Sequence, residues 1–291
     1  MTRQALRGST AIITGANRGL GLAIAKAYAT AGADLALGAR DEALLESEAD
    51  ALRRVFPDRR IIIRKLDVAS YSDAEAFVAW SVHRLGRIDV LVNNAGIYGP
   101  MGDIDKVDMT SWIEAIQINL MGSVYMARFV SAHMKKNRAG SIIQISWGGA
   151  TNPLPGISAY AASKAAVVRF AETLALEVQD YGISVNAIAP GALNTRMLDQ
   201  VIEAGPEMVG KKFFERSLAQ REQGGVPLEK GAELAVFLAT ESGRRITGRL
   251  ISAVWDRYED WPQHADALVN SDAYTLRRIT GRERNLEWGD R

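Results

Sequence analysis

The chain of 291 residues contains no cysteine and only three histidines, at positions 83, 133 and 264. Without cysteine, disulfide bonds and thiolate metal sites are impossible. The three histidines are scattered along the chain and are too few to suggest a metal cluster. We therefore expect no bound metal.

Long apolar runs and an excess of charge of one sign are also lacking. No uninterrupted apolar segment approaches the roughly 20 residues needed to cross a bilayer, and the first eight residues lack the apolar core of a signal peptide. The 35 basic and 34 acidic residues are interspersed and give a net charge of +1, which indicates neither a nucleic acid nor an acidic membrane as partner. We expect a cytoplasmic protein that acts on a small molecule.

What the sequence does contain is a regular alternation of short apolar runs and helical patterns. Such alternation is typical of a parallel sheet with helices on both faces, and it predicts one doubly wound (Rossmann-type) α/β domain over residues 1–254. Its seven strands are expected at residues 9–14, 34–38, 61–66, 88–92, 141–146, 183–188 and 249–254, and its helices at 22–29, 41–54, 72–85, 109–136, from Tyr160 onward and at 229–241. Residues 196–226 are expected to form a lid; an ordinary surface excursion is the alternative.

A glycine-rich turn, Gly15–Gly21, follows the first strand and precedes a helical pattern. Glycines there allow the backbone to approach a pyrophosphate, whose charge is met by free N–H groups and the positive end of the helix. The second strand ends at Ala39 and Arg40, where dinucleotide-binding folds contact the adenosine ribose. A guanidinium pairs with a 2′-phosphate whereas a carboxylate would repel it, so Arg40 and Arg18 favour NADP(H). The alternatives are a tight connection without a ligand and two solvated arginines.

Tyr160 and Lys164 are four residues apart in an alanine-rich helical run, so both side chains lie on one face of the helix. A nearby ammonium favours the phenolate and lowers the pKa of a tyrosine, and such a pair can transfer a proton. Taken alone, the spacing also arises by chance on an amphipathic helix.

Polar residues mark the ends of the third and fourth strands and the middle of the long helix. Asp67 and the pair Asn93–Asn94 follow strands, at the edge where open α/β sheets bind ligands. Turn chemistry explains an asparagine pair equally well. Asn119 interrupts the helix expected at 109–136; of a functional kink and an exposed polar residue, its spacing favours the exposed residue.

Five motifs, in this order and spacing, resemble the short-chain dehydrogenase/reductase family: Thr14–Gly21, Asn93–Gly96, Asn119, Tyr160 with Lys164, and Pro190–Thr195. The resemblance covers about residues 8–254. It implies that Tyr160 donates and accepts the proton, that Lys164 orients the nicotinamide ribose and lowers the Tyr160 pKa, and that Asn119 holds a water in a proton relay. It also implies assembly into a homodimer or homotetramer through the fourth and fifth helices.

The same resemblance assigns contacts to the cofactor. Asp67 would meet the adenine, Asn93 would support the cofactor, and Thr195 would bind the nicotinamide carboxamide. The full set of expected cofactor-binding residues is Gly15, Asn17, Arg18, Gly19, Leu20, Gly21, Arg40, Asp67, Val68, Asn93, Ala95, Gly96, Tyr160, Lys164, Pro190, Gly191 and Thr195.

One position departs from the family pattern at the centre of the expected chemistry. The family usually places a serine 13 residues before the tyrosine, where its hydroxyl binds the substrate oxygen, and this chain has Trp147 there. The nearest hydroxyl is Ser146, although neighbouring side chains of an extended segment point to opposite faces. Trp147 is therefore expected to line the substrate pocket, with Tyr160, Lys164, Asn119 and Ser146 as catalytic residues. The alternative is that Trp147 turns away into the core or a subunit contact and leaves Ser146 or Thr151 to serve.

These residues together predict an NADP(H)-dependent oxidoreductase that interconverts a carbonyl and a secondary alcohol. A cofactor-binding protein with little or no turnover is the alternative, because Trp147 replaces the usual serine.

The second departure is a C-terminal extension, residues 255–291, which is rich in aromatic residues. Aromatic side chains are costly to leave in water. We expect an ordered tail with a short helix starting near Pro262, packed across a subunit boundary or over the mouth of the pocket. A tail packed only on its own domain is the alternative.

Overall fold

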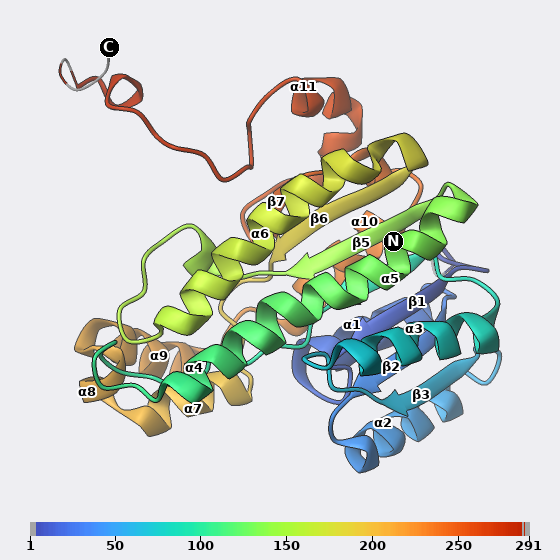
Figure 1. The fold of residues 1–291 in the computed structure, drawn as a ribbon, viewed down its shortest axis with the longest axis horizontal. Coiled ribbons are helices and arrows are strands. Elements are labelled where there is room, and N and C mark those ends of the chain that lie inside the picture. Colours follow the sequence, from blue (N-terminus) through green and yellow to red (C-terminus); the bar gives the residue numbers. More distant parts are fainter. Residues whose placement is uncertain (1–3, 287, 289–291) are drawn as a thin grey trace.

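A seven-stranded parallel sheet forms the centre of the computed structural model, which describes residues 4–286 and 288 (Figure 1). The strand order is β3-β2-β1-β4-β5-β6-β7, so the chain moves outward in both directions from β1 and β4. The predicted doubly wound α/β fold is confirmed. The strands are β1 (Thr10–Thr14), β2 (Asp34–Ala39), β3 (Ile61–Lys65), β4 (Val90–Asn93), β5 (Gly140–Ile145), β6 (Ile183–Ala189) and β7 (Leu250–Ser252).

Two hydrophobic cores lie on the two faces of this sheet, because successive side chains of a strand point to opposite faces. Ile13 of β1 packs in one core with helices α1 (Gly19–Thr30), α2 (Glu42–Val55) and α10 (Leu228–Ala239). Its neighbour Ile12 packs in the other with α3 (Tyr71–Leu85), α5 (Gly122–Asn137) and α6 (Ser158–Val178). Strands buried on both faces explain the continuous apolar runs in the sequence.

The helix expected over residues 109–136 is interrupted. It consists of α4 (Met109–Ile116), one π-helical turn at Gln117–Met121 and α5. Asn119 lies in that turn and is buried, so the expectation of an exposed polar residue was wrong. A π turn inserts one extra residue into a helix, and such turns are frequent at functional sites.

The segment expected to form a lid contains three short helices, α7 (Arg196–Ala204), α8 (Pro206–Val209) and α9 (Lys211–Gln223), at the lower left of Figure 1. Val201 and Val209 form a third, smaller apolar cluster with Tyr98, Ile157 and Tyr160. This segment therefore packs over the start of α6, where Tyr160 lies.

The tail folds back on its own chain. A 3-10 segment at Tyr258–His264 leads into α11 (Ala265–Val269), and a last 3-10 turn lies at Arg282–Arg284. The short helical segment is present, but it begins four residues before the expected Pro262. Tyr258 and Trp261 are buried, while Trp255 and Trp288 are among the exposed apolar residues.

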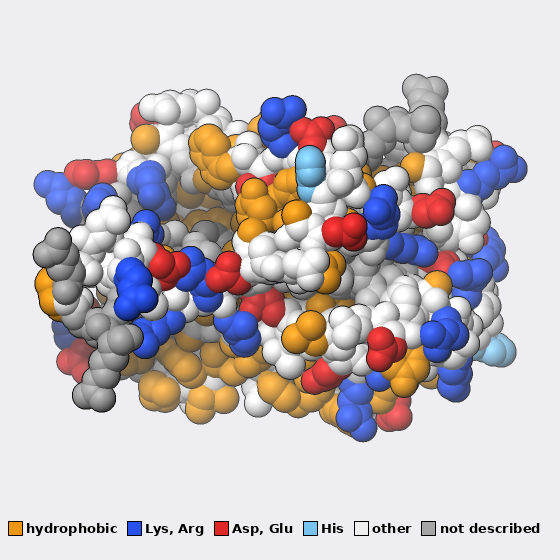
Figure 2. Space-filling view, turned by 90° about the horizontal axis from the view of Figure 1, so that it is seen from above, with side chains coloured by type: hydrophobic (Ala, Val, Ile, Leu, Met, Phe, Trp, Pro, Cys, Tyr) orange, Lys and Arg blue, Asp and Glu red, His pale blue; other side chains and the backbone are white. Residues whose placement is uncertain are grey.

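Charged side chains of both signs are interspersed on the surface shown in Figure 2. Within the described part of the chain, no helix combines the length and the apolar character that a membrane span requires. The described residues also contain no cluster of three or more metal-ligating side chains.

Candidate active site

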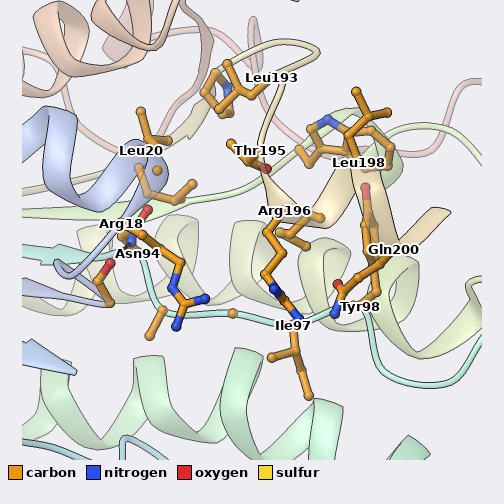
Figure 3. Close-up of a pocket in the computed structure, with 18 of the residues that line it drawn as sticks. Arg18, Leu20, Asn94, Ile97, Tyr98, Leu193, Thr195, Arg196, Leu198 and Gln200 are labelled. Atoms are coloured by element: carbon orange, nitrogen blue, oxygen red, sulfur yellow. Dashed lines mark hydrogen bonds between the residues drawn. The ribbon is translucent and has the colours of Figure 1, made fainter. Parts of the chain in front are cut away.

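A cavity of about 760 Å³ opens at the carboxyl ends of the parallel strands. The turn after β1 and the residues that follow β2, β3, β4, β5 and β6 all line it, together with α7 and α9. Its volume lies in the usual range for ligand pockets, and its position is the edge where open α/β sheets bind their ligands. In Figure 3, Arg18 and Leu20 lie on one side of the pocket, and Tyr98 and Gln200 lie on the other.

The glycine turn forms a narrow cradle between β1 and α1. A Cβ on Gly21 would lie 2.2 Å from the Gly15 carbonyl oxygen and 2.5 Å from Asn94 Nδ2, so only glycine fits there. Arg18 is the residue before the first turn of α1, and its side chain does not cap the helix. The first N–H groups of α1 are therefore available to an anion in the pocket, at the positive end of the helix.

Two arginines flank the pocket near the end of β2. The Arg18 guanidinium lies 3.9 Å from Asp41, and the Arg40 guanidinium lies 3.8 Å from Glu114. All four side chains are about half exposed, so these long ion pairs contribute little stability. Both guanidinium groups therefore remain available to a phosphate. Asp41 is otherwise engaged, because its Oδ1 accepts the Leu44 N–H and caps α2.

The two asparagines of the predicted pair, at the end of β4, have different surroundings. Asn93 is buried, donates to the Ser123 carbonyl oxygen of α5 and does not line the pocket. Asn94 does line it, and its Nδ2 donates to the carbonyl oxygens of Thr14 and Gly15 at 3.0 and 3.1 Å. Asn94 thus holds the glycine turn, a position that the sequence reasoning did not assign to it.

Tyr160 and Lys164 lie together at the inner end of the cavity. Both are buried, and the Lys164 ammonium lies 5.6 Å from the centre of the Tyr160 ring. Lys164 Nζ donates to the Ile145 carbonyl oxygen at 2.7 Å. Burial lowers the pKa of Lys164 to about 8.

The pKa of Tyr160 is shifted opposite to the expected direction. Burial raises it well above its ordinary value, and the neighbouring Tyr98 phenol raises it further. Lys164 does not offset that effect. The Tyr160 phenol therefore keeps its proton throughout the physiological pH range.

Asn119 acts on the loop after β4 rather than lining the cavity. Its Oδ1 accepts the Ile97 N–H at 2.8 Å, while its Nδ2 donates to the Ile97 carbonyl oxygen at 2.8 Å and to Ser163 Oγ at 2.9 Å. The π turn thus ties the segment before Tyr98 to α6.

Trp147 points into the pocket and not into the main core. Its ring is 5.6 Å from that of Tyr160, 6.2 Å from that of Tyr98 and 6.2 Å from that of Phe213, centre to centre. Ser146 is buried, and its hydroxyl donates to the Lys164 carbonyl oxygen at 3.5 Å. The place expected for a substrate-binding serine thus holds an indole inside an aromatic wall.

Most of the expected cofactor-binding residues do lie around this one cavity. Those that line it are Gly15, Asn17, Arg18, Gly19, Leu20, Arg40, Asp67, Val68, Ala95, Gly96, Tyr160, Lys164, Pro190, Gly191 and Thr195, whereas Gly21 lies behind the turn. The sequence reasoning missed Asn94, Tyr98 and the pocket-facing lid residues, such as Arg196, Gln200 and Phe213. Tyr98 is two residues beyond the Asn93–Gly96 motif, which was the only available signal for it.

Comparison with known proteins agrees with this geometry. Residues 9–205 match the family model described as short chain dehydrogenase. L-fucose dehydrogenase of Oryctolagus cuniculus is 34% identical over 240 residues, which cover 81% of this chain and 80% of that protein.

Two solved structures share the fold over 85% of this chain. Levodione reductase superposes with a TM-score of 0.78 at 28% identity, covering 96% of its own chain. NAD+-bound xylitol dehydrogenase superposes with a TM-score of 0.78 at 26% identity, covering 98% of its own chain. The protein is accordingly an oxidoreductase of alcohol and carbonyl substrates that uses a nicotinamide cofactor, and it belongs to the short-chain dehydrogenase family.

Proposed function

We propose that this protein is an NADP(H)-dependent oxidoreductase that interconverts a carbonyl and a secondary alcohol. The observation that carries the proposal is one continuous cavity with the glycine cradle near one end and Tyr160 with Lys164 at the other. A dinucleotide fits these residues for two reasons. The turn is so tight that position 21 has room only for glycine, and the N-terminus of α1 is free to meet a diphosphate. The bound nicotinamide would supply or accept the hydride.

Arg18 and Arg40 support a preference for NADP(H). Both line the cavity together with Asp67 and Val68, which we expect to contact the adenosine. Ala39 ends β2 with no carboxylate that would bind a free 2′-hydroxyl. A 2′-phosphate would accept charge-assisted hydrogen bonds from both guanidinium groups.

The first prediction is that Arg40→Ala weakens NADPH binding and leaves NADH binding unchanged. Hydrogen bonds to charged groups contribute about 1.5 to 3 kcal/mol, so the Kd for NADPH should rise roughly 10- to 100-fold. Titration of cofactor fluorescence with both dinucleotides measures this. Arg54→Ala, on the exposed side of α2, is the matched control. Tighter binding of NADH than NADPH by the wild-type protein would overturn the preference.

The protonation states suit Tyr160 to the reduction of a carbonyl. A phenol whose pKa is raised by burial is protonated at neutral pH, and it can donate its proton to an oxygen that receives negative charge. Lys164 would hold the nicotinamide ribose, and its charge would stabilise the phenolate left behind. Asn119 would keep the loop after β4 in place beneath these groups.

The alternative function, a cofactor-binding protein with little turnover, is favoured by Trp147 alone. Assays of oxidation and reduction with both cofactors against sugars, acyl thioesters and cyclic ketones separate the two. Binding of NADPH without turnover of any of these substrates would favour the alternative.

The proposed assembly is a homodimer or homotetramer formed through α5 and α6. The exposed Leu176 on α6 supports it, because a large apolar side chain on a helix surface gains from burial in an interface.

A further inference from the structure

The pocket needs a hydrogen-bond donor for the substrate oxygen, and the usual position for one is occupied by Trp147. In the reduction of a carbonyl, negative charge develops on the oxygen as hydride arrives. A donor already aimed at that oxygen stabilises the transition state. Ser146 and Thr151 carry the hydroxyls nearest to position 147 in the sequence, and Tyr98 lies beside Trp147 in the fold.

Two of these hydroxyls are badly placed. Ser146 is 1% exposed, and its hydroxyl donates to the backbone of α6 at Lys164. Thr151 is exposed and is not among the residues that line the cavity. Thr151 thus lies outside the cavity, and Ser146, although it lines the cavity, already directs its hydroxyl proton to a backbone carbonyl oxygen.

Tyr98 meets the requirement. It lies in the segment after β4, is 7% exposed and lines the cavity. Its ring meets that of Tyr160 edge to face, with centres 4.6 Å apart. Within residues 4–286 and 288, no hydrogen-bond partner engages its hydroxyl.

The ring contact brings the two phenols close enough to interact electrostatically. The Tyr98 phenol raises the pKa of Tyr160, because ionising both phenols would bring two negative charges together. Burial raises the pKa of Tyr98 itself to about 12, so Tyr98 keeps its proton and remains a donor at neutral pH.

We propose that the Tyr98 hydroxyl replaces the missing serine and donates a hydrogen bond to the substrate oxygen beside Tyr160. This assignment rests on the proposed function. In the reducing direction the carbonyl carbon gains the hydride, and the oxygen takes the Tyr160 proton. Tyr98 keeps its own proton throughout, and solvent returns a proton to the Tyr160 phenolate.

The aromatic wall explains how Tyr98 is held in place. Trp147 contacts both Tyr98 and Tyr160, and Phe213 of α9 contacts Trp147 from the lid side. Asn119 fixes the backbone of Ile97, the residue before Tyr98, through two hydrogen bonds. Trp147, which stands in place of the serine donor, thus also holds the Tyr98 ring in position.

The experiment is Tyr98→Phe, which removes the hydroxyl and keeps the ring. We expect kcat for the best substrate of the panel to fall about 10²- to 10³-fold, while the Kd for NADPH and the melting temperature stay at the wild-type values. Tyr181→Phe makes the same chemical change in the turn before β6, outside the cavity, and should leave all three quantities unchanged.

A second variant separates a lost donor from disturbed packing. Trp147→Ser in the Tyr98→Phe background returns a hydroxyl to the family position and should recover activity. Full activity of Tyr98→Phe, or a loss of activity in Ser146→Ala instead, would overturn the assignment to Tyr98. If the wild-type protein binds NADPH but turns over no substrate, the proposed function fails and the role of Tyr98 fails with it. If the wild-type protein turns over a substrate and Tyr98→Phe has the same kcat, the proposed function stands and the Tyr98 assignment alone is wrong.

Discussion

At the scale of single residues, Lys164 shows what it costs in free energy to bury a charged group inside a pocket. It is 4% exposed, and its ammonium donates to the Ile145 carbonyl oxygen instead of pairing with a carboxylate. Burial without an opposite charge favours the neutral amine, and the pKa falls from 10.5 to about 8. The charged state of Lys164 therefore opposes folding, and its cost depends on pH.

That dependence gives a prediction for the protein without cofactor. Between pH 8 and 10 the unfolded chain keeps the Lys164 proton and the folded chain releases it, so the free energy of unfolding rises with pH. At about 1.36 kcal/mol per pH unit, Lys164 should contribute a rise of about 2 kcal/mol across this window. Tyr160, whose pKa is raised, opposes this only above pH 10.

Denaturant unfolding of the wild-type protein and Lys164→Met at pH 7, 8, 9 and 10 measures the effect. The rise should be missing in Lys164→Met and present in Lys26→Met, a control on the exposed side of α1. Identical pH profiles for the wild type and Lys164→Met would show that the buried amine is not the source.

The sequence could predict residues of the pocket where they belong to a motif, as Tyr160 and Lys164 do, or where they follow a strand. Gly15, Asp67 and Thr195 were expected from such positions, and all three line the cavity. Tyr98 and Phe213 were not, because their placement depends on how a loop and the lid pack against α6. Position in a motif predicts backbone location, whereas side-chain contacts between distant loops need the fold.

At the scale of elements, the π turn at Gln117–Met121 joins the cofactor edge of the sheet to α6. The apolar periodicity of residues 109–136 did not reveal it, since a single extra residue hardly changes that periodicity. Asn119 marked a possible kink, but its spacing favoured an exposed residue. The decisive feature is tertiary: Asn119 satisfies both backbone groups of Ile97 and also reaches Ser163. An exposed asparagine would have no such partners.

We predict that Asn119→Ala lowers the free energy of unfolding by about 2 to 4 kcal/mol, because it leaves the N–H and carbonyl groups of Ile97 without their side-chain partner and removes one of the two hydrogen bonds of Ser163. Asn119→Asp keeps the acceptor for the Ile97 N–H but places a buried carboxylate oxygen against the Ile97 carbonyl oxygen, so its loss should be at least as large. Denaturant titration gives the three values. Asn137→Ala, at the exposed end of α5, should cost less than about 0.5 kcal/mol. Equal losses at positions 119 and 137 would contradict the role given to the turn.

At the scale of the whole molecule, the tail is part of the same core that holds α1 and α10. Tyr258, Trp261 and Leu268 are buried in that core. Arg249 is buried and donates to the carbonyl oxygens of Leu268 and Ser271, so it ties α11 to the start of β7. The parallel sheet with helices on both faces followed from the alternating pattern of the sequence, but this packing did not, because the tail has no repeating apolar period.

Further along the tail, the backbone is fixed on α6. Glu172 accepts the Leu276 N–H at 2.7 Å, and Arg169 donates to the Leu276 carbonyl oxygen. Beyond this anchor the apolar side chains Ile279, Leu286 and Trp288 are exposed. The tail thus divides at about residue 278 into a part that completes the core and a part whose apolar groups face outward.

The last prediction compares two deletions that differ by this division. Removing residues 256–291 takes three large buried side chains from the core, each of which contributes about 1.5 to 3 kcal/mol, so the loss is comparable to the whole stability of a domain and the chain should fail to fold. Removing only residues 279–291 should leave the melting temperature within a few degrees of the wild-type value. If the outward-facing apolar groups lie in a subunit contact, this shorter deletion should also reduce the mass measured by light scattering. A shorter deletion that unfolds the protein would contradict the anchor at Leu276, and one that changes neither stability nor mass would leave no role for these residues in assembly.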